Sequence, residues 1–202
     1  MDTAGLLLTG GRSARMGTDK AALRLPSSGS GYGEPMSLTL AERTARLLEA
    51  ATKVALEVGP GFSHLSRVAE SPPQAGPLAA LVAGATELVR IGWKGPVLVV
   101  ATDLPRLNAA MLGWLANHQP GCSVVPLSRG VPQPLCARYE PEDLAAASRL
   151  LAGGSRSMFS LIDEVKPQLV PEDTWVPFAG DPLCLDDLDT PEQLDAHEGG
   201  PG

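Results

Sequence analysis

GLLLTGGRSARMGTDK, residues 5–20, is the stretch from which the fold can be worked out. The apolar run Gly5–Leu8 predicts a short buried strand, and the chain breaks at Gly10-Gly11 directly after it. Three cations follow within the same stretch, Arg12, Arg15 and Lys20. Glycines let backbone N–H groups converge on oxygen atoms, and fixed positive side chains neutralise an anion. We therefore predict a phosphate-binding turn at the end of a first strand.

Segments downstream of this turn alternate between helix and strand patterns. The expected elements are a helix over 39–51, strands over 54–58 and 65–70, a helix over 78–91, a strand over 96–101 and a helix over about 108–118. Thr39 is the expected N-cap of the first helix, with Glu42 completing a capping box. The order β-α-β-β-α-β-α argues for an α/β fold in which helices cover a mostly parallel sheet.

Composition limits the classes of function. The 202 residues fit one large α/β domain, with two small domains as the alternative, and a net charge of −7 argues against nucleic-acid binding. No apolar run approaches the roughly 20 residues that span a membrane. The start of the chain also lacks the basic segment of a signal peptide. We expect a cytoplasmic protein whose three separated cysteines, Cys122, Cys136 and Cys184, are free and mostly buried thiols.

Two predicted strands end in residues with suggestive chemistry. Leu8 leads into the glycine-rich turn, and Val100 leads into Asp103. Ligands of parallel sheets bind beyond the carboxyl ends of the strands. Asp103 can therefore hold a divalent metal on bound phosphates, since Mg²⁺ takes one or two carboxylates plus phosphate oxygens and water. The alternative is that Asp103 only caps the helix that follows.

The second half of the chain is less regular. We expect strands over 122–126, 133–139 and 168–170 and helices over 144–151 and 158–165, with Thr190 capping a short helix that starts at Pro191. The segment Gly153–Ser157 is either a second anion site aided by Arg156 or a connection between helices. The three histidines share no spacing and are expected on the surface. Residues 26–35 form a Gly/Ser/Pro-rich flexible loop, either a tolerated insertion or a flap near the anion site, and residues 197–202 are expected to be disordered.

Residues 7–20 resemble the signature of the molybdenum cofactor guanylyltransferases, the MobA-like nucleotidyltransferases. That signature is approximately L-x-G-G-x-S-x-R-M-G-x-D-K, and this chain matches each specified position from Leu8 to Lys20. Four later segments resemble further family motifs in the same order, namely residues 76–81 (GPLAAL), 102–105 (TDLP), 133–139 (QPLCARY) and 187–194 (DLDTPEQL). The resemblance covers nearly the whole chain. It implies a Rossmann-like three-layer α/β/α fold of the nucleotide-diphospho-sugar-transferase type.

The resemblance also implies site residues. Backbone atoms of four consecutive residues would bind the nucleotide, Leu8, Thr9, Gly10 and Gly11. Arg15 and Lys20 would hold the triphosphate and Asp103 would bind Mg²⁺, so these three are the expected catalytic residues. The family contacts guanine with an acidic residue before the GPLA segment, and Glu70 is the nearest candidate here.

This chain departs from the family pattern at two places. The family has an Asn after the second strand, where this chain has Glu57-Val58-Gly59, and its closing Asn positions are Asp187 and Asp189 here. The two aspartates are either extra metal or pterin contacts or part of an Asx-type turn before Thr190.

The activity implied by the resemblance is transfer of GMP from GTP to Mo-molybdopterin, with release of pyrophosphate. Residues 1–202 would form a single domain. Its N-terminal half, to about residue 107, would bind nucleotide and metal, and its C-terminal half, about 108–196, would bind the acceptor. Arg156 would then contact the molybdopterin phosphate, and molybdoenzymes or other cofactor-biosynthesis proteins would be partners. Alternatives are a cytidylyltransferase acting on molybdopterin, a nucleotidyltransferase for another phosphorylated acceptor, and a non-enzymatic nucleotide-sensing domain.

Overall fold

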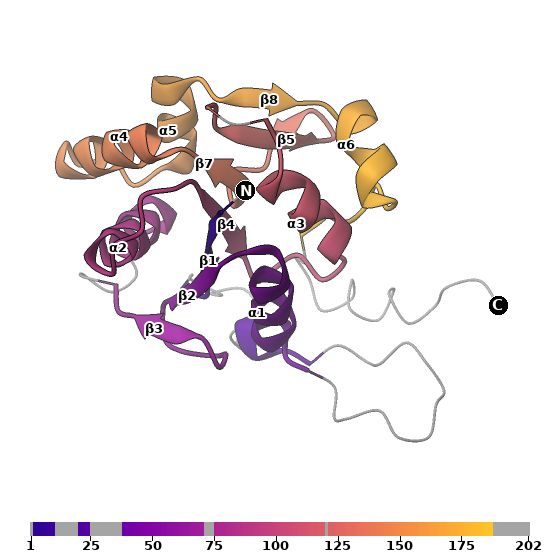
Figure 1. Ribbon diagram of the computed structural model, residues 1–202, viewed down its shortest axis with the longest axis horizontal. Coiled ribbons are helices and arrows are strands. Elements are labelled where there is room, and N and C mark those ends of the chain that lie inside the picture. Colours follow the sequence, from indigo (N-terminus) through magenta and orange to yellow (C-terminus); the bar gives the residue numbers. More distant parts are fainter. Residues whose placement is uncertain (1, 11–19, 25–37, 71–74, 120, 188–202) are drawn as a thin grey trace.

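The computed structural model describes residues 2–10, 20–24, 38–70, 75–119 and 121–187 (Figure 1). The predictions for the loop over 26–35, for the helix capped by Thr190 and for the tail over 197–202 lie outside the described residues. Strands from both halves of the chain join one sheet, in the order β3-β2-β1-β4-β7-β5-β6, with β8 paired to β5.

The N-terminal part of the sheet is parallel. It consists of β1 (Ala4–Leu8), β2 (Val54–Val58), β3 (Ser66–Val68) and β4 (Val97–Ala101). The C-terminal part turns antiparallel at β7 (Cys136–Tyr139) and continues through β5 (Val124–Ser128) and β6 (Val131–Pro132), while β8 (Gln168–Val170) runs parallel to β5. Leu8 pairs with Ala101 where β1 and β4 end. The segments that follow these two strands therefore start side by side at one edge of the sheet.

Helices cover both faces of the sheet, which confirms the three-layer prediction (Figure 1). One face carries α2 (Pro77–Arg90), α4 (Pro141–Ala152) and α5 (Met158–Val165), and the other carries α1 (Leu40–Ala51), α3 (Ala109–Ala116) and α6 (Glu172–Ala179). Each face has its own apolar core, because side chains alternate along the strands. Leu6 and Leu8 belong to the core under α2, while Leu7 belongs to the core under α1.

Local sequence signals account for the helix starts. Thr39 caps α1 as predicted, since its hydroxyl accepts the Glu42 N–H at 3.2 Å. The described contact of the Glu42 carboxylate is not with the Thr39 backbone, as a capping box would have it, but with the ring of His64 at 2.8 Å. Because His64 lies in the β2–β3 loop, this contact links that loop to α1. Pro77 starts α2 at the first helical position.

The structure differs from the sequence expectations mainly in the second half. The segment expected as a strand over 133–139 becomes extended only at Cys136, and Gln133–Leu135 form a turn. The strand expected over 122–126 runs over 124–128. In this half, β6 and α6 were not predicted. Helix α6 contains Pro177, which hides it from a pattern-based prediction.

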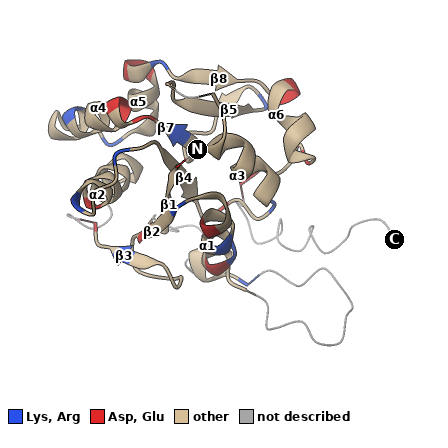
Figure 2. Cartoon of the chain, in the orientation of Figure 1, with Lys and Arg blue, Asp and Glu red and all other residues tan. Residues whose placement is uncertain are grey.

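Charged residues colour mainly the helices and loops in Figure 2, while most of the sheet is tan. Arg138 on β7 is an exception that the sequence did not reveal. It is fully buried and donates to the carbonyls of His118, Gln119 and Cys122 at 2.7–3.0 Å and to Glu140 at 2.8 Å. These contacts give Arg138 a structural role, because they fix the α3–β5 connection. Within the described residues, none of the helices has the length and apolar character required to cross a membrane.

Candidate active site

The turn after β1 packs against the loop after β2. The Thr9 N–H donates to the Val58 carbonyl at 3.0 Å. A Cβ placed on Gly59 would lie 2.5 Å from Thr9 Oγ1 and 2.8 Å from the Gly10 nitrogen. Gly59 also has φ of +142°, a conformation that favours glycine. Glycine at position 59 therefore lets the two loops touch through their backbones.

Glu70 reaches the same turn from beyond the end of β3. A Cβ placed on Gly10 would overlap Glu70 Oε1 and lie 3.1 Å from its Cδ. The structure thus brings together Thr9, Gly10 and Glu70, three of the residues that the family resemblance assigned to the nucleotide. Gly11 and Arg15 lie outside the described residues. Lys20 is described only as the first residue of a short 3₁₀ helix, η1 (Lys20–Ala22).

A buried carboxylate lies beneath this turn. Glu57 on β2 is 0% exposed, and all four of its described hydrogen-bond donors are neutral. Oε1 accepts from the Thr9 hydroxyl at 2.6 Å and the Phe62 N–H at 2.6 Å, while Oε2 accepts from the Ser63 N–H at 2.8 Å and the Ser63 hydroxyl at 2.7 Å. Burial by itself would raise the pKa of Glu57, but these hydrogen bonds outweigh it and lower the pKa below its usual value. Glu57 is therefore a carboxylate at neutral pH.

Asp103 follows β4 at the same edge of the sheet. The prediction that it might only cap the next helix is wrong, because Asn108 caps α3 by accepting the Met111 N–H at 2.9 Å. Asp103 instead lines a cavity of about 260 Å³, together with Asp187 from the far end of the described chain. Residues more than 80 positions apart in sequence thus contribute carboxylates to one cavity.

The rest of this cavity is mostly apolar, and Gln133 is the polar residue of its further lining. Its further lining comes from the β4 end, the β5–β7 hairpin and α5, namely Ala101, Leu104, Val131, Pro132, Gln133, Pro134, Leu135 and Phe159. Phe159 and Val131 are large apolar side chains that remain 50% and 51% exposed. The sequence singled out residues 133–139 as a family motif but gave no role to Phe159. An exposed aromatic beside two carboxylates suits a ligand with a flat apolar part and an anionic, metal-bound part.

The carboxylates of this cavity fit a divalent metal. Within the described residues there is no cluster of three or more His, Cys, Asp or Glu side chains suited to enclosing an ion. Asp103 and Asp187 could hold a divalent metal only together with further ligands, and Mg²⁺ commonly takes one or two carboxylates plus phosphate oxygens and water. The nearby thiols are not alternatives. Burial, followed by the charges of Cys184 and Asp103, raises the pKa of Cys136 far above its usual range, so it stays protonated.

Arg156 lies in the connection between α4 and α5. Its guanidinium donates to the carbonyls of Leu151 at 3.2 Å and Ser155 at 2.8 Å. Its backbone carbonyl would lie 3.3 Å from a Cβ on Gly76, the residue that precedes α2. The contacts seen for Arg156 therefore belong to the helix connection, and its contact with an acceptor phosphate stays a prediction. Asp189 lies outside the described residues.

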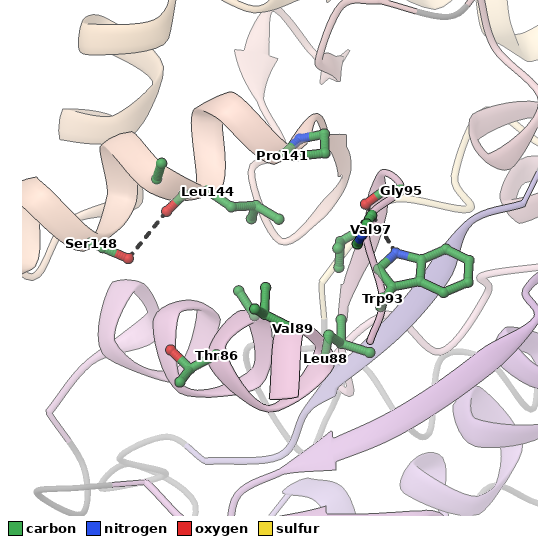
Figure 3. A pocket seen from close by; sticks show the side chains of 12 residues that line it. Thr86, Leu88, Val89, Trp93, Gly95, Val97, Pro141, Leu144 and Ser148 are labelled. Atoms are coloured by element: carbon green, nitrogen blue, oxygen red, sulfur yellow. Dashed lines mark hydrogen bonds between the residues drawn. The ribbon is translucent and has the colours of Figure 1, made fainter. Parts of the chain in front are cut away.

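A larger cavity, about 440 Å³, lies between α2 and α4 (Figure 3). Leu88 and Val89 face Leu144 across it, and Trp93 closes one end (Figure 3). Val97, the first residue of β4, also lines it, so this cavity lies at the amino edge of the parallel strands. Its lining is mostly apolar and contains no carboxylate. It is therefore separate from the site formed around Thr9 and Asp103.

Comparison with known proteins identifies the family. Residues 5–167 match the family described as "MobA-like NTP transferase domain". The chain belongs to this family. A protein from Opitutus terrae named "Probable molybdenum cofactor guanylyltransferase" is 36% identical over 166 residues, which cover 77% of this chain and 75% of that protein. A protein of the same name from Chloroflexus aggregans is 30% identical over 96% of this chain and 92% of its own length. This MobA-like chain is thus a member of a nucleotidyltransferase family.

Solved structures agree on the fold. Molybdopterin-guanine dinucleotide biosynthesis protein A from Archaeoglobus fulgidus superposes with a TM-score of 0.73 at 18% identity, with 97% of each chain covered. The 2-C-methyl-D-erythritol 4-phosphate cytidylyltransferase from Thermus thermophilus gives 0.61 at 16% identity over 98% of each chain. A manganese complex of Rv0371C from Mycobacterium tuberculosis gives 0.56 at 13% identity, covering 85% of this chain and 88% of that one. The fold is that of the nucleotide-diphospho-sugar transferases, as the sequence predicted.

Proposed function

We propose that this chain transfers GMP from GTP to the phosphate of Mo-molybdopterin, releasing pyrophosphate and forming the molybdopterin guanine dinucleotide cofactor. The relatives named for this activity, at 36% and 30% identity, motivate the choice of substrates. The observation that carries the proposal is the adjacency of two chemically different sites. The Thr9–Gly10 turn and the Asp103 cavity follow neighbouring strands whose last residues, Leu8 and Ala101, are paired.

The nucleotide side of the proposal rests on the turn after β1. Backbone groups of Leu8, Thr9 and Gly10 would contact the nucleotide, and Gly11, Arg15 and Lys20 would continue the contact to its phosphates. Glu70 lies against Gly10, and we propose it as the acidic group that accepts hydrogen bonds from the base. Guanine offers adjacent N–H donors on one edge, which a carboxylate can accept as a pair. If Glu70 contacts the base, it would favour guanine over a base that presents only one donor there.

The acceptor side rests on the cavity beside Asp103. A phosphate monoester attached to a flat ring system would lie with its ring against Phe159 and its phosphate towards the two carboxylates. Like charges repel, so that placement requires a cation between phosphate and carboxylates. Asp103 and Asp187 would hold a divalent metal there, and we propose Mg²⁺. When bound, the metal would neutralise charge on the triphosphate and the attacking phosphate.

The chemical step makes few demands on the protein. An oxygen of the acceptor phosphate forms a bond to the α-phosphorus of GTP. The bond between the α-phosphorus and the oxygen that bridges it to the β-phosphorus breaks, and pyrophosphate leaves with that electron pair. The attacking oxygen is already anionic, so no strong general base is needed. Alignment and charge neutralisation supply the catalysis, and the chain provides both through its turn after β1 and through the two cationic side chains Arg15 and Lys20.

The compartment and protein partners belong to the same proposal. The three cysteines are all free thiols, which suits the reducing cytoplasm. The product would pass to molybdoenzymes, directly or through another protein of the same biosynthetic route.

Nucleotide binding with a metal titration tests the proposal. Melting temperature is measured with GTP, CTP or ATP, with and without Mg²⁺, because a ligand that binds only the folded state raises it. We expect GTP to give the largest shift and expect Asp103→Asn to remove the Mg²⁺-dependent part. Asp2→Asn is the matched control, since Asp2 lies at the opposite edge of the sheet beside exposed Lys53. A larger shift with CTP would favour the cytidylyltransferase alternative, and no shift with any nucleotide would contradict the proposal.

A further inference from the structure

Glu57 is a buried carboxylate with four described hydrogen-bond donors, and the family resemblance assigned it no role. It lies on the face of the sheet that carries α1, since Leu7, its direct partner across β1 and β2, belongs to the core under that helix. Thr9 follows Leu7 on the same face of the chain by the two-residue alternation of strands. The Glu57 carboxylate and the Thr9 hydroxyl therefore lie on the same face of the sheet and form a hydrogen bond, although the two residues are 48 positions apart in sequence.

Glu57 also holds the loop after β2, which touches the Thr9–Gly10 turn. Both oxygens of Glu57 accept backbone N–H groups, from Phe62 and from Ser63. The same loop begins at Gly59, whose backbone lies against Thr9 and Gly10 and whose carbonyl accepts from Arg67 Nε at 2.8 Å. Glu57 thus joins two loops that approach each other at van der Waals distance.

The chemistry of this junction requires a carboxylate. Each oxygen accepts two hydrogen bonds, and all four donors are neutral groups of Thr9, Phe62 and Ser63. A glutamine side chain has one acceptor oxygen and one NH₂ donor. The Thr9 or Ser63 hydroxyl could rotate to accept from that NH₂, but the backbone N–H of Phe62 or Ser63 could not, so it would face another donor. A buried charge is unfavourable unless its hydrogen bonds are made. Moving either loop away would remove hydrogen bonds from the charged Glu57, so this cost opposes the movement.

We propose that Glu57 is a positioning residue for nucleotide binding, whose carboxylate sets the distance between the Thr9–Gly10 turn and the Gly59–Ser63 loop. It does not touch the nucleotide, because both of its oxygens are already engaged by the protein. It acts through the Thr9 hydroxyl, and this inference rests on the proposed nucleotide site. Preorganisation of this kind raises affinity by removing the cost of ordering the loops on binding.

A double-mutant cycle on GTP affinity tests this inference. Glu57→Gln, Thr9→Val and the double variant are compared with the unaltered chain by calorimetry with GTP and Mg²⁺, and turnover is measured with Mo-molybdopterin. We expect each single variant to weaken GTP binding by about tenfold, the loss typical of a charged hydrogen bond. The double variant is expected to be no weaker than either single variant, because both changes remove the same contact. Thr9→Ser keeps the hydroxyl and should restore affinity.

Two further readouts separate positioning from general destabilisation. KM for GTP should rise in Glu57→Gln while kcat stays close to its original value, because the Asp103 cavity is untouched. Hydrogen exchange of the Phe62 and Ser63 amides in the ligand-free protein should become faster. Glu87→Gln is the matched control, because Glu87 also accepts two hydrogen bonds, from Arg90, but lies near the far end of α2. It should leave GTP binding unchanged.

Three results would overturn the inference. They are unchanged GTP affinity in Glu57→Gln, losses that multiply in the double variant, and a loss in kcat without a change in KM. Failure of the proposed function would be visible separately. An unaltered chain that binds no GTP contradicts both proposals, whereas an unaltered chain that binds GTP as tightly as its Glu57→Gln variant contradicts only this one.

Discussion

Gly10→Ala probes the nucleotide side of the site with a single methyl group. The new Cβ would overlap Oε1 of Glu70 and lie 3.1 Å from its Cδ. Carbon atoms prefer separations of about 3.5–4.0 Å. The overlapping Oε1 is the nearer atom, so the carboxyl group must retreat by at least about 1 Å, which the long glutamate side chain can do without moving the backbone.

This displacement should affect binding rather than folding. Gly10 is not among the glycines with positive φ, so alanine fits its backbone, and such a change alters stability by about +0.4 to +1 kcal/mol in favour of the folded state. A hydrogen-bonding group displaced by this distance typically costs about 1–3 kcal/mol of binding free energy, which corresponds to a roughly 5- to 150-fold weaker complex. We expect GTP affinity to fall within that range while the melting temperature stays constant or rises slightly.

The assay compares GTP affinity and melting temperature for Gly10→Ala, Glu70→Ala and the double variant. If Glu70 is the group that moves, adding Gly10→Ala to Glu70→Ala should cost little more. Gly113→Ala in α3 is the control, since no atom lies within 4 Å of its added Cβ. Unchanged GTP affinity in Gly10→Ala, or unfolding of the variant, would refute the reasoning. Gly59→Ala should instead destabilise the fold by about 1–3 kcal/mol, because its φ of +142° and its contact with the Gly10 nitrogen both oppose a side chain.

Three further predictions concern the metal, the surface histidine and the thiols. Asp187→Asn should raise the Mg²⁺ concentration for half-maximal activity by up to about tenfold, and an unchanged requirement in a metal titration would limit Asp187 to a turn. His64 makes contacts of 2.8 Å to Glu42 through one ring nitrogen and to Glu49 through the other, and both carboxylates raise its pKa. Its small stabilising effect, at most about 1 kcal/mol, should be complete below the unfolded pKa and disappear as pH rises through the folded pKa. NMR titration should show the pKa of His64 falling in Glu42→Gln, and an unchanged value would exclude the contact. Cys136 and Cys184 should resist thiol reagents in the folded protein, because burial raises both pKa values, that of Cys184 to about 12. Rapid labelling of either, read by mass spectrometry, would contradict their burial.

The first half of the fold could be predicted because its signals are local. Pro96–Ala101 is a continuous apolar run, and β4 within it is buried along its whole length between two helical layers. Such a strand shows no alternation, and only its length and the residues that bound it distinguish it from a helix. The helix over 172–179 gave no comparable signal. It contains Pro177, and its anchor is the fully buried Trp175, whose ring N–H donates to the Leu127 carbonyl at 2.9 Å. That contact is tertiary and leaves no periodic pattern.

In the candidate site, too, some residues follow from local sequence signals and others depend on contacts between distant segments. Gly10 and Asp103 could be proposed from the sequence because glycines and acids after buried strands have a direct chemical use, whereas Thr9 was proposed only through the family resemblance. The approach of Glu70 to Gly10 depends on how the β3 end folds back, and sequence alone suggested Glu70 only through the family resemblance. The partners of Glu57 could not be predicted, although an acidic residue within the strand VALEV was visible as a departure. Its four donors become neighbours only when the loop over 59–63 closes over the sheet.

Pyrophosphate release tests the central claim most directly. The purified chain is incubated with Mg²⁺, Mo-molybdopterin and GTP, CTP or ATP, and pyrophosphate is measured together with the dinucleotide product. The account predicts release with GTP that requires Mo-molybdopterin and Asp103, equal in amount to the molybdopterin guanine dinucleotide formed. GTP binding without release would indicate a nucleotide sensor, and preferential release from CTP would indicate a cytidylyltransferase. Either result would contradict the proposed guanylyl transfer.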